Sequence, residues 1–144
     1  MAYQWRAVDA RLDSLLPAAP VVALEGAKGV GKTATARQRA AQQWQLDLAR
    51  DRDALRADPG ILRRGPHPTL VDEWQRHPES WDLARRWVDD GARPGSLILT
   101  GSAAPPPGVD THSGSGRIIA LKMRPMALFE RGLTPSVSLA ALLH

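Results

Sequence analysis

Short apolar runs divide the chain into regularly spaced segments. The run Val21–Leu24 is apolar at every position, which is typical of a parallel strand buried on both faces. Residues 44–48 alternate between apolar and polar, which predicts a short edge strand. Together with three further apolar runs, the pattern predicts strands over 21–25, 44–48, 69–72, 96–100 and 117–121.

The intervals between these runs favour helices, because their apolar residues lie close to helical spacing or because Pro and Gly are missing. We predict helices over 6–16, 32–43 and 51–57, one more turn at 61–64, a helix opened by Pro78 and a last helix that begins at Met126. Strands that alternate with helices indicate an α/β fold with a mostly parallel sheet. In such folds ligands bind at the carboxyl ends of the strands.

Composition narrows this picture without changing it. The chain has 144 residues, which suits a single domain over residues 1–144. The formal net charge is +4, but the basic residues occur singly or in pairs, so contact with nucleic acid is allowed rather than indicated. The sequence has no Cys, no apolar stretch long enough to span a membrane and no apolar signal segment. We therefore expect a cytoplasmic protein without a membrane partner.

A glycine-rich segment directly after the first strand carries the strongest chemical signal. Its spacing, Gly, four residues, then Gly-Lys-Thr, is that of a phosphate-binding loop between a strand and a helix. The glycines let successive backbone N–H groups face one anion, and Lys32 adds a positive charge for the β- and γ-phosphates. The Thr33 hydroxyl is a hard oxygen ligand suited to Mg²⁺. The residues predicted to bind nucleotide here are Gly26, Ala27, Lys28, Gly29, Val30, Gly31, Lys32 and Thr33.

Two acidic residues, Asp72 and Glu73, stand at the carboxyl end of the predicted strand 69–72. Asp72 can hold Mg²⁺ through its water shell, and Glu73 can orient or deprotonate the water that attacks the γ-phosphate. This pair indicates hydrolysis by water, whereas a kinase would need an acceptor site, for which no motif is visible. The alternative is an Asp at a strand end followed by a Glu that caps the next helix.

Two later positions complete the predicted site. Thr100 or Ser102, at the tip of the strand 96–100, would contact the γ-phosphate or the attacking water, and the pattern does not choose between them. Arg117 opens the last strand and would stabilise charge in its own site or in that of a neighbouring copy, as in a homo-oligomer. The alternatives are an ordinary turn at 100–102 and a solvated or ion-paired Arg117.

Five segments of the chain, taken together, match the motifs of one protein family. They are 26–33, Leu70–Gln75, Leu97–Ser102, Gly116-Arg117 and Met123–Glu130. They resemble a family of prokaryotic AAA-type ATP-binding proteins, in which the ATPase domain is usually followed by a C-terminal domain. The resemblance runs from about Tyr3 to the end of the chain. It implies a three-layer, AAA-like P-loop NTPase core with a five-stranded, mostly parallel sheet, here without the lid domain with which family members continue.

The resemblance also implies roles for these segments. The glycine-rich segment would be the Walker A motif, with its phosphate and magnesium residues, and Asp72-Glu73 would be the Walker B motif. Thr100 or Ser102 would be the sensor. Arg117 matches the place of an arginine finger.

We therefore predict an ATP hydrolase with ATP and Mg²⁺ as its ligands. Glu73, Lys32 and Arg117 would be catalytic, while Thr33 and Asp72 would bind the metal. One alternative is a nucleotide-binding module with little or no turnover, whose activity would be insensitive to Glu73→Gln. Another is a DNA-contacting protein that uses dispersed arginines, whose binding would weaken as the salt concentration rises.

Overall fold

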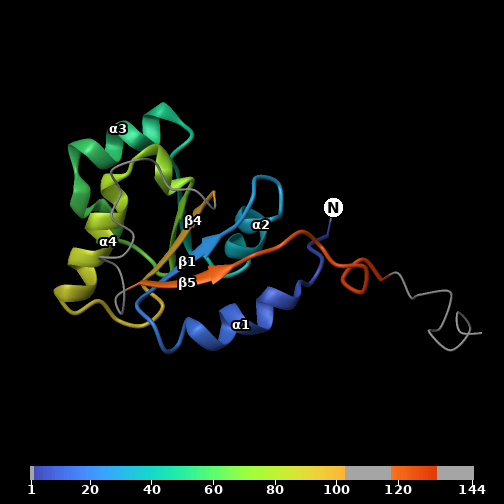
Figure 1. The fold of residues 1–144 in the computed structure, drawn as a ribbon. Coiled ribbons are helices and arrows are strands. Elements are labelled where there is room, and N and C mark those ends of the chain that lie inside the picture. The colour runs from blue at the N-terminus through green and yellow to red at the C-terminus, as the bar shows by residue number, and fades with distance from the viewer. Residues whose placement is uncertain (1, 103–117, 133–144) are drawn as a thin grey trace, which may run out of the picture.

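The computed structural model describes residues 2–102 and 118–132, which form one sheet with helices on both faces (Figure 1). The strands are β1 (Val21–Glu25), β2 (Gln42–Gln45), β3 (Thr69–Asp72), β4 (Leu97–Gly101) and β5 (Ile118–Lys122). The helices are α1 (Ala7–Leu15), α2 (Lys32–Arg37), α3 (Ala49–Ala57) and α4 (Glu79–Asp89), with the short 3-10 helices η1 (Pro59–Arg63) and η2 (Trp74–Arg76).

All strand pairs in the sheet are parallel, and the strand order is β2-β3-β4-β1-β5. β1 lies inside the sheet, where Val21 stands opposite Leu97 of β4 and Ile118 of β5. Because parallel strands end at one edge, the residues that follow β1, β3 and β4 come together there. The predicted α/β class and parallel sheet are confirmed.

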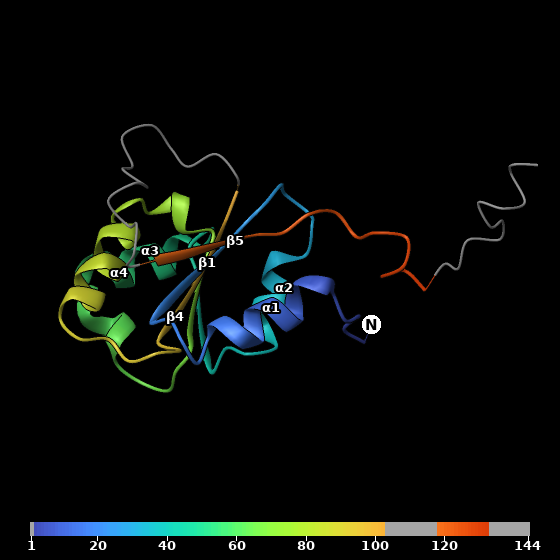
Figure 2. The same cartoon turned by 60° about the horizontal axis from the view of Figure 1, so that its bottom comes forward.

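Strand side chains alternate between two layers of helices, which cover opposite faces of the sheet (Figures 1 and 2). The core beneath α1 and α2 includes Leu12, Val22, Leu24, Ala36, Leu70 and Ile98. The core beneath α3 and α4 includes Val21, Ala23, Leu55, Val71, Trp81 and Ala84. Burial on both faces explains why β1 is apolar at successive positions. Within the described part of the chain, no helix is long and apolar enough to cross a membrane.

The boundary between α2 and β2 differs from the prediction. α2 ends at Arg37, well before its predicted end, and the edge strand covers 42–45 rather than 44–48. The strand begins early because its backbone pairs along β3, and the N–H of Ala41 already donates to the carbonyl of Pro68 at 2.8 Å. Its side chains are half-buried and mostly glutamine. The apolar alternation over 44–48 therefore predicted bounds that lie too late along the chain.

Near the C-terminal end, the prediction for Arg117 falls outside the described residues, and a second prediction changes. Among the described residues, the predicted helix from Met126 is absent, and residues 128–132 form turns, with a hydrogen bond of 3.2 Å from the N–H of Arg131 to the carbonyl of Ala127. The Glu130 carboxylate closes this turn by accepting the N–H of Ala127 at 2.6 Å. The other predicted elements agree with the structure to within two residues at each end.

Candidate functional site

The glycine-rich loop runs from the end of β1 to the start of α2. Gly29 and Gly31 have φ angles of 83° and 101°, in the left-handed region that favours glycine. Gly26 is required for another reason, because a Cβ there would lie 2.3 Å from the carbonyl oxygen of Met123. The loop is therefore shaped by its own backbone and also by the chain that follows β5.

Lys32 is folded back into this loop. Its side chain is buried, and its ammonium donates hydrogen bonds of 2.7 Å and 2.8 Å to the carbonyls of Gly26 and Ala27. Burial lowers the pKa of Lys32, while the negative charges of Glu73 and Asp72 act in the opposite direction. The loop thus encloses a positive charge that lies near two carboxylates.

Asp72, at the end of β3, is the point where side chains from α2, β3 and β4 meet. Its Oδ1 accepts a hydrogen bond of 2.7 Å from the Thr33 hydroxyl and another from the Thr100 hydroxyl. Asp72 is 7% exposed and Thr100 is 1% exposed. The structure therefore brings the predicted residues Thr33, Asp72 and Thr100 into direct contact.

Glu73 has a strained backbone. Its φ of 59° and ψ of 49° make it the one non-glycine residue with positive φ among the described residues. Such conformations cost about 1–3 kcal/mol and cluster at functional sites. The Glu73 carboxylate accepts a hydrogen bond from the side-chain amide of Gln75, whose nitrogen lies 3.5 Å from Ser102 Oγ. No sequence pattern predicts this link, because it depends on how the short helix η2 places Gln75 beside Glu73.

Packing around the turn after β3 explains a glycine at the end of β4. A Cβ at Gly101 would lie 2.6 Å from Trp74 Nε1 and 2.7 Å from Gln75 Oε1. Trp74 is 2% exposed and its ring centroid lies 4.8 Å from that of Trp81, so the indole has no free space into which to move. Glycine is the residue that leaves room for this contact between η2 and β4.

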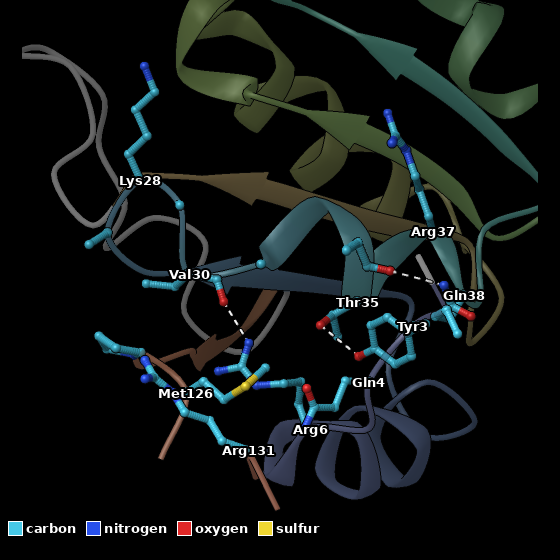
Figure 3. A pocket seen from close by; sticks show the side chains of 16 residues that line it. Tyr3, Gln4, Arg6, Lys28, Val30, Thr35, Arg37, Gln38, Met126 and Arg131 are labelled. Carbon is cyan, nitrogen blue, oxygen red and sulfur yellow. Dashed lines mark hydrogen bonds between the residues drawn. The ribbon is translucent and has the colours of Figure 1, made fainter. Parts of the chain in front are cut away.

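A cavity of about 900 Å³ adjoins the glycine-rich loop (Figure 3). Its wall combines loop residues, part of α2, the N-terminal segment 2–6 and residues between 125 and 131. The wall includes aromatic and apolar side chains, among them Tyr3, Val30 and Met126, and positive charges from Lys28, Arg37 and Arg131. Asp72 and Glu73 are not among its lining residues. No sequence pattern predicts this cavity, because its wall comes from segments far apart along the chain.

Hydrogen bonds hold the N-terminal wall of this cavity against α2. The Tyr3 hydroxyl donates to Asp9 Oδ2 at 2.7 Å and lies 2.9 Å from Thr35 Oγ1. Asp9 is 0% exposed and also pairs with Arg39. Burial is the largest of the effects that raise the pKa of Tyr3, so the phenol remains protonated at neutral pH. These contacts to Asp9 and to Thr35 of α2 therefore fix Tyr3 in the wall of the cavity.

Comparisons with known proteins agree with this architecture. A family model described as "AAA domain" matches residues 18–131. "Uncharacterized protein Rv2008c" of Mycobacterium tuberculosis and "Uncharacterized protein Mb2031c" of Mycobacterium bovis are each 31% identical over 137 residues, which covers 92% of this chain and 31% of the relative. The chain thus spans about a third of the length of these curated relatives. Domain III of the Thermotoga maritima replication initiation protein DnaA is similar in fold, with a TM-score of 0.51 at 14% identity over 86% of this chain and 62% of that chain.

Proposed function

The chain belongs to the AAA domain family, and from this membership we propose that it binds Mg·ATP in the loop 26–33 and hydrolyses it. The family and the fold together suggest nucleotide binding. The choice of ATP follows from the family, while the role of magnesium and the hydrolysis step rest on the chain's own residues.

Convergence on Asp72 is the observation that supports the proposal most. The hydroxyls of Thr33 and Thr100 both bond to this carboxylate, and the buried ammonium of Lys32 lies in the adjoining loop. Burying charged and polar groups is costly unless they are paired. A merely structural turn has no need of such a cluster, whereas a site for phosphates and a divalent cation does.

The donor set at this place suits Mg²⁺. The Thr33 hydroxyl and the Asp72 carboxylate are hard oxygen donors, and they lie 2.7 Å apart. Thr33 would serve as a direct ligand, and Asp72 would hold the ion through bound water. When bound, the ion neutralises charge on the β- and γ-phosphates.

The cavity beside the loop is suited to the nucleoside. A nucleotide whose phosphates lie in the loop 26–33 must place its ribose and base next to that loop, where the cavity of about 900 Å³ opens. The ring of Tyr3 and the side chains of Val30 and Met126 offer aromatic and apolar contact to a purine. We therefore assign the base to this cavity.

Hydrolysis requires a group that orients water, and we assign that role to Glu73. The water oxygen bonds to the γ-phosphorus while the bond to the bridging oxygen breaks, and Glu73 takes up the proton of the water. Lys32 stabilises the charge that develops on the phosphate oxygens. Ser102 is the better of the two sensor candidates, because Thr100 is buried and bonded to Asp72.

We assign Arg117 to the site of a neighbouring copy in a homo-oligomer. Arg117 itself lies outside the described residues, but the next residue, Ile118, pairs with Val21 at the start of β1. The loop 26–33 follows the opposite end of β1, at Glu25. Four residues of strand separate the two ends, which is roughly 13 Å. The start of β5 and the loop 26–33 thus lie at opposite ends of β1, which supports the proposal that Arg117 acts in another molecule's site.

Nucleotide titration and phosphate-release assays test the proposal. The wild-type chain should bind Mg·ATP, Lys32→Ala should lose most of that affinity, and Glu73→Gln should bind ATP without turning it over. Equal affinity of the wild type and Lys32→Ala would refute the nucleotide site. Unchanged turnover in Glu73→Gln would refute the role of Glu73 and favour a different path of hydrolysis.

A further inference from the structure

We propose that Arg6 is a positioning residue of the glycine-rich loop and that Glu130 holds Arg6 in place. This inference rests on the proposed nucleotide site. It assigns to the chain after β5 a task that the sequence did not suggest, which is to keep the loop in the conformation that receives phosphate.

The Arg6 side chain links the N-terminal segment to the chain after β5 and to the glycine-rich loop, and Figure 3 draws its bond to Val30 in that loop. It is 5% exposed, and its Nη1 donates to the carbonyl oxygen of Val30 in the loop at 2.6 Å. Its Nη2 donates to the carbonyl of Arg124 at 2.9 Å, and its Nε lies 3.3 Å from Glu130 Oε1. A guanidinium presents donors in a rigid planar fork, so three bonds of this kind fix its orientation.

The bond to Val30 controls the direction of one loop amide. A peptide unit is planar and trans, so the carbonyl of Val30 and the N–H of Gly31 point in opposite directions. When Arg6 binds that carbonyl, the N–H of Gly31 is turned away from Arg6. Gly31 has a φ of 101°, a region open mainly to glycine, so without an external hold this peptide has many alternatives.

Close packing supports the same relationship. A Cβ at Gly31 would lie 3.1 Å from Arg6 Nη1 and 3.5 Å from Met123 Cε, so the guanidinium and the methionine fill the space behind the loop. The carbonyl of Met123 limits Gly26 in the same way, at 2.3 Å from a Cβ there. The loop therefore rests on Arg6 and on the residues that follow β5.

Glu130 secures Arg6 from the other side. Its Oε1 accepts the backbone N–H of Ala7 at 2.7 Å, and its Oε2 accepts the N–H of Ala127 at 2.6 Å. These two backbone hydrogen bonds, with the charge of Arg6, hold the pKa of Glu130 below its usual range. Glu130 is thus ionised at neutral pH and ties Arg6, the start of α1 and the turn after β5 together.

A direct contact between Arg6 and the nucleoside is the competing explanation, because Arg6 also lines the cavity. The two explanations differ in which part of the ligand they affect. Positioning of the loop should alter the affinity for any ligand that carries the phosphates. Contact with the base or ribose should alter the affinity for ATP alone.

The test measures, by isothermal titration calorimetry, the affinities of the full chain for Mg·ATP and for Mg·tripolyphosphate, which has no nucleoside. Arg6→Ala should weaken both by about tenfold, the equivalent of about 1.4 kcal/mol. Glu130→Gln keeps the side-chain size and should weaken both by about threefold, or about 0.65 kcal/mol, so it replaces Arg6→Ala if that variant fails to fold. Arg52→Ala is the matched control, because Arg52 donates to the carbonyl of Leu46 at 2.7 Å, away from the loop, and should leave both affinities unchanged.

The possible results separate this inference from the function on which it rests. Loss of affinity for ATP alone in Arg6→Ala would overturn loop positioning in favour of nucleoside contact. Wild-type affinities for both ligands in folded Arg6→Ala or in Glu130→Gln would overturn it outright, while a weak Lys32→Ala would still uphold the nucleotide site. A wild-type chain that binds neither ligand would overturn the proposed function and this inference together.

Discussion

Replacing Gly101 by alanine tests whether the packing of η2 against β4 supports catalysis. The added methyl group would lie 2.6 Å from Trp74 Nε1, 2.7 Å from Gln75 Oε1 and 2.8 Å from Trp74 Cδ1. Trp74 is enclosed by the core, whereas the Gln75 side chain is held at its end by hydrogen bonds to the Glu73 carboxylate and the Ser102 hydroxyl, which are easier to break than the core packing is to open. We therefore expect Gln75 to move, which breaks the hydrogen bond from its amide to the Glu73 carboxylate.

The size of the effect follows from the crowding. Overpacking of a well-packed region costs about 1–3 kcal/mol. In a domain of this size, about 1 kcal/mol lowers Tm by roughly 3–5 °C, so we expect a fall of roughly 3–15 °C. A catalytic group that is misplaced by about 1 Å loses up to about 100-fold in rate, so kcat should fall at least about tenfold while ATP affinity is retained.

Thermal unfolding and steady-state phosphate release measure the two effects separately. Gly91→Ala is the matched control, because Gly91 has a φ of 94° and no heavy atom within 4 Å of an added Cβ. Its backbone strain should lower Tm by an amount that corresponds to about 1–2 kcal/mol without changing kcat. A Gly101→Ala variant with unchanged Tm would refute the crowding, and one that is destabilised but has wild-type kcat would refute the role of Gln75 in holding Glu73.

Four further substitutions, one of them a control, test the metal residue, the buried ion pair and the core. Asp72→Ala should weaken the dependence of nucleotide affinity on Mg²⁺, as measured by titration with and without EDTA, and a dependence equal to that of the wild type would exclude Asp72 as a metal residue. Arg39→Ala should cost about 3 kcal/mol in urea unfolding, because it leaves the 0%-exposed Asp9 without its arginine. Arg64→Ala, which breaks an exposed pair, should cost less than about 0.5 kcal/mol, and equal losses for the two arginines would contradict this reasoning. Leu70→Ala should cost about 2–5 kcal/mol in the same assay, since Leu70 is 0% exposed, and a loss as small as that of Arg64→Ala would place β3 outside the core.

Local sequence patterns were enough to predict the strands and the loop of the site. β1 was predicted with its observed bounds, because a strand buried on both faces has an apolar residue at successive positions. The meeting of Thr33, Asp72 and Thr100 was also foreseeable, since each follows or ends a parallel strand and such strands end at one edge. These three residues are close in space because of the sheet topology, and no pattern of residue types links them in pairs.

The edge strand shows where local patterns fail. β2 consists largely of half-buried glutamines, and its position is decided by backbone pairing with β3. The early end of α2 has the same cause, because the chain must leave the helix in time to reach the sheet edge. No Pro or Gly marks this end in the sequence. Backbone hydrogen bonds between strands carry no residue-type signature, so the sequence favoured a longer helix and a later strand.

The glycine-rich loop and its place between a strand and a helix were determined by the sequence alone, because glycine, lysine and threonine at fixed spacing act through local backbone geometry. Only the tertiary structure decided what stands behind that loop. Arg6 contacts Val30, 24 positions away, and Glu130, 124 positions away. Contacts across such separations depend on how the two ends of the domain fold onto one sheet, and no periodicity in the chain encodes them.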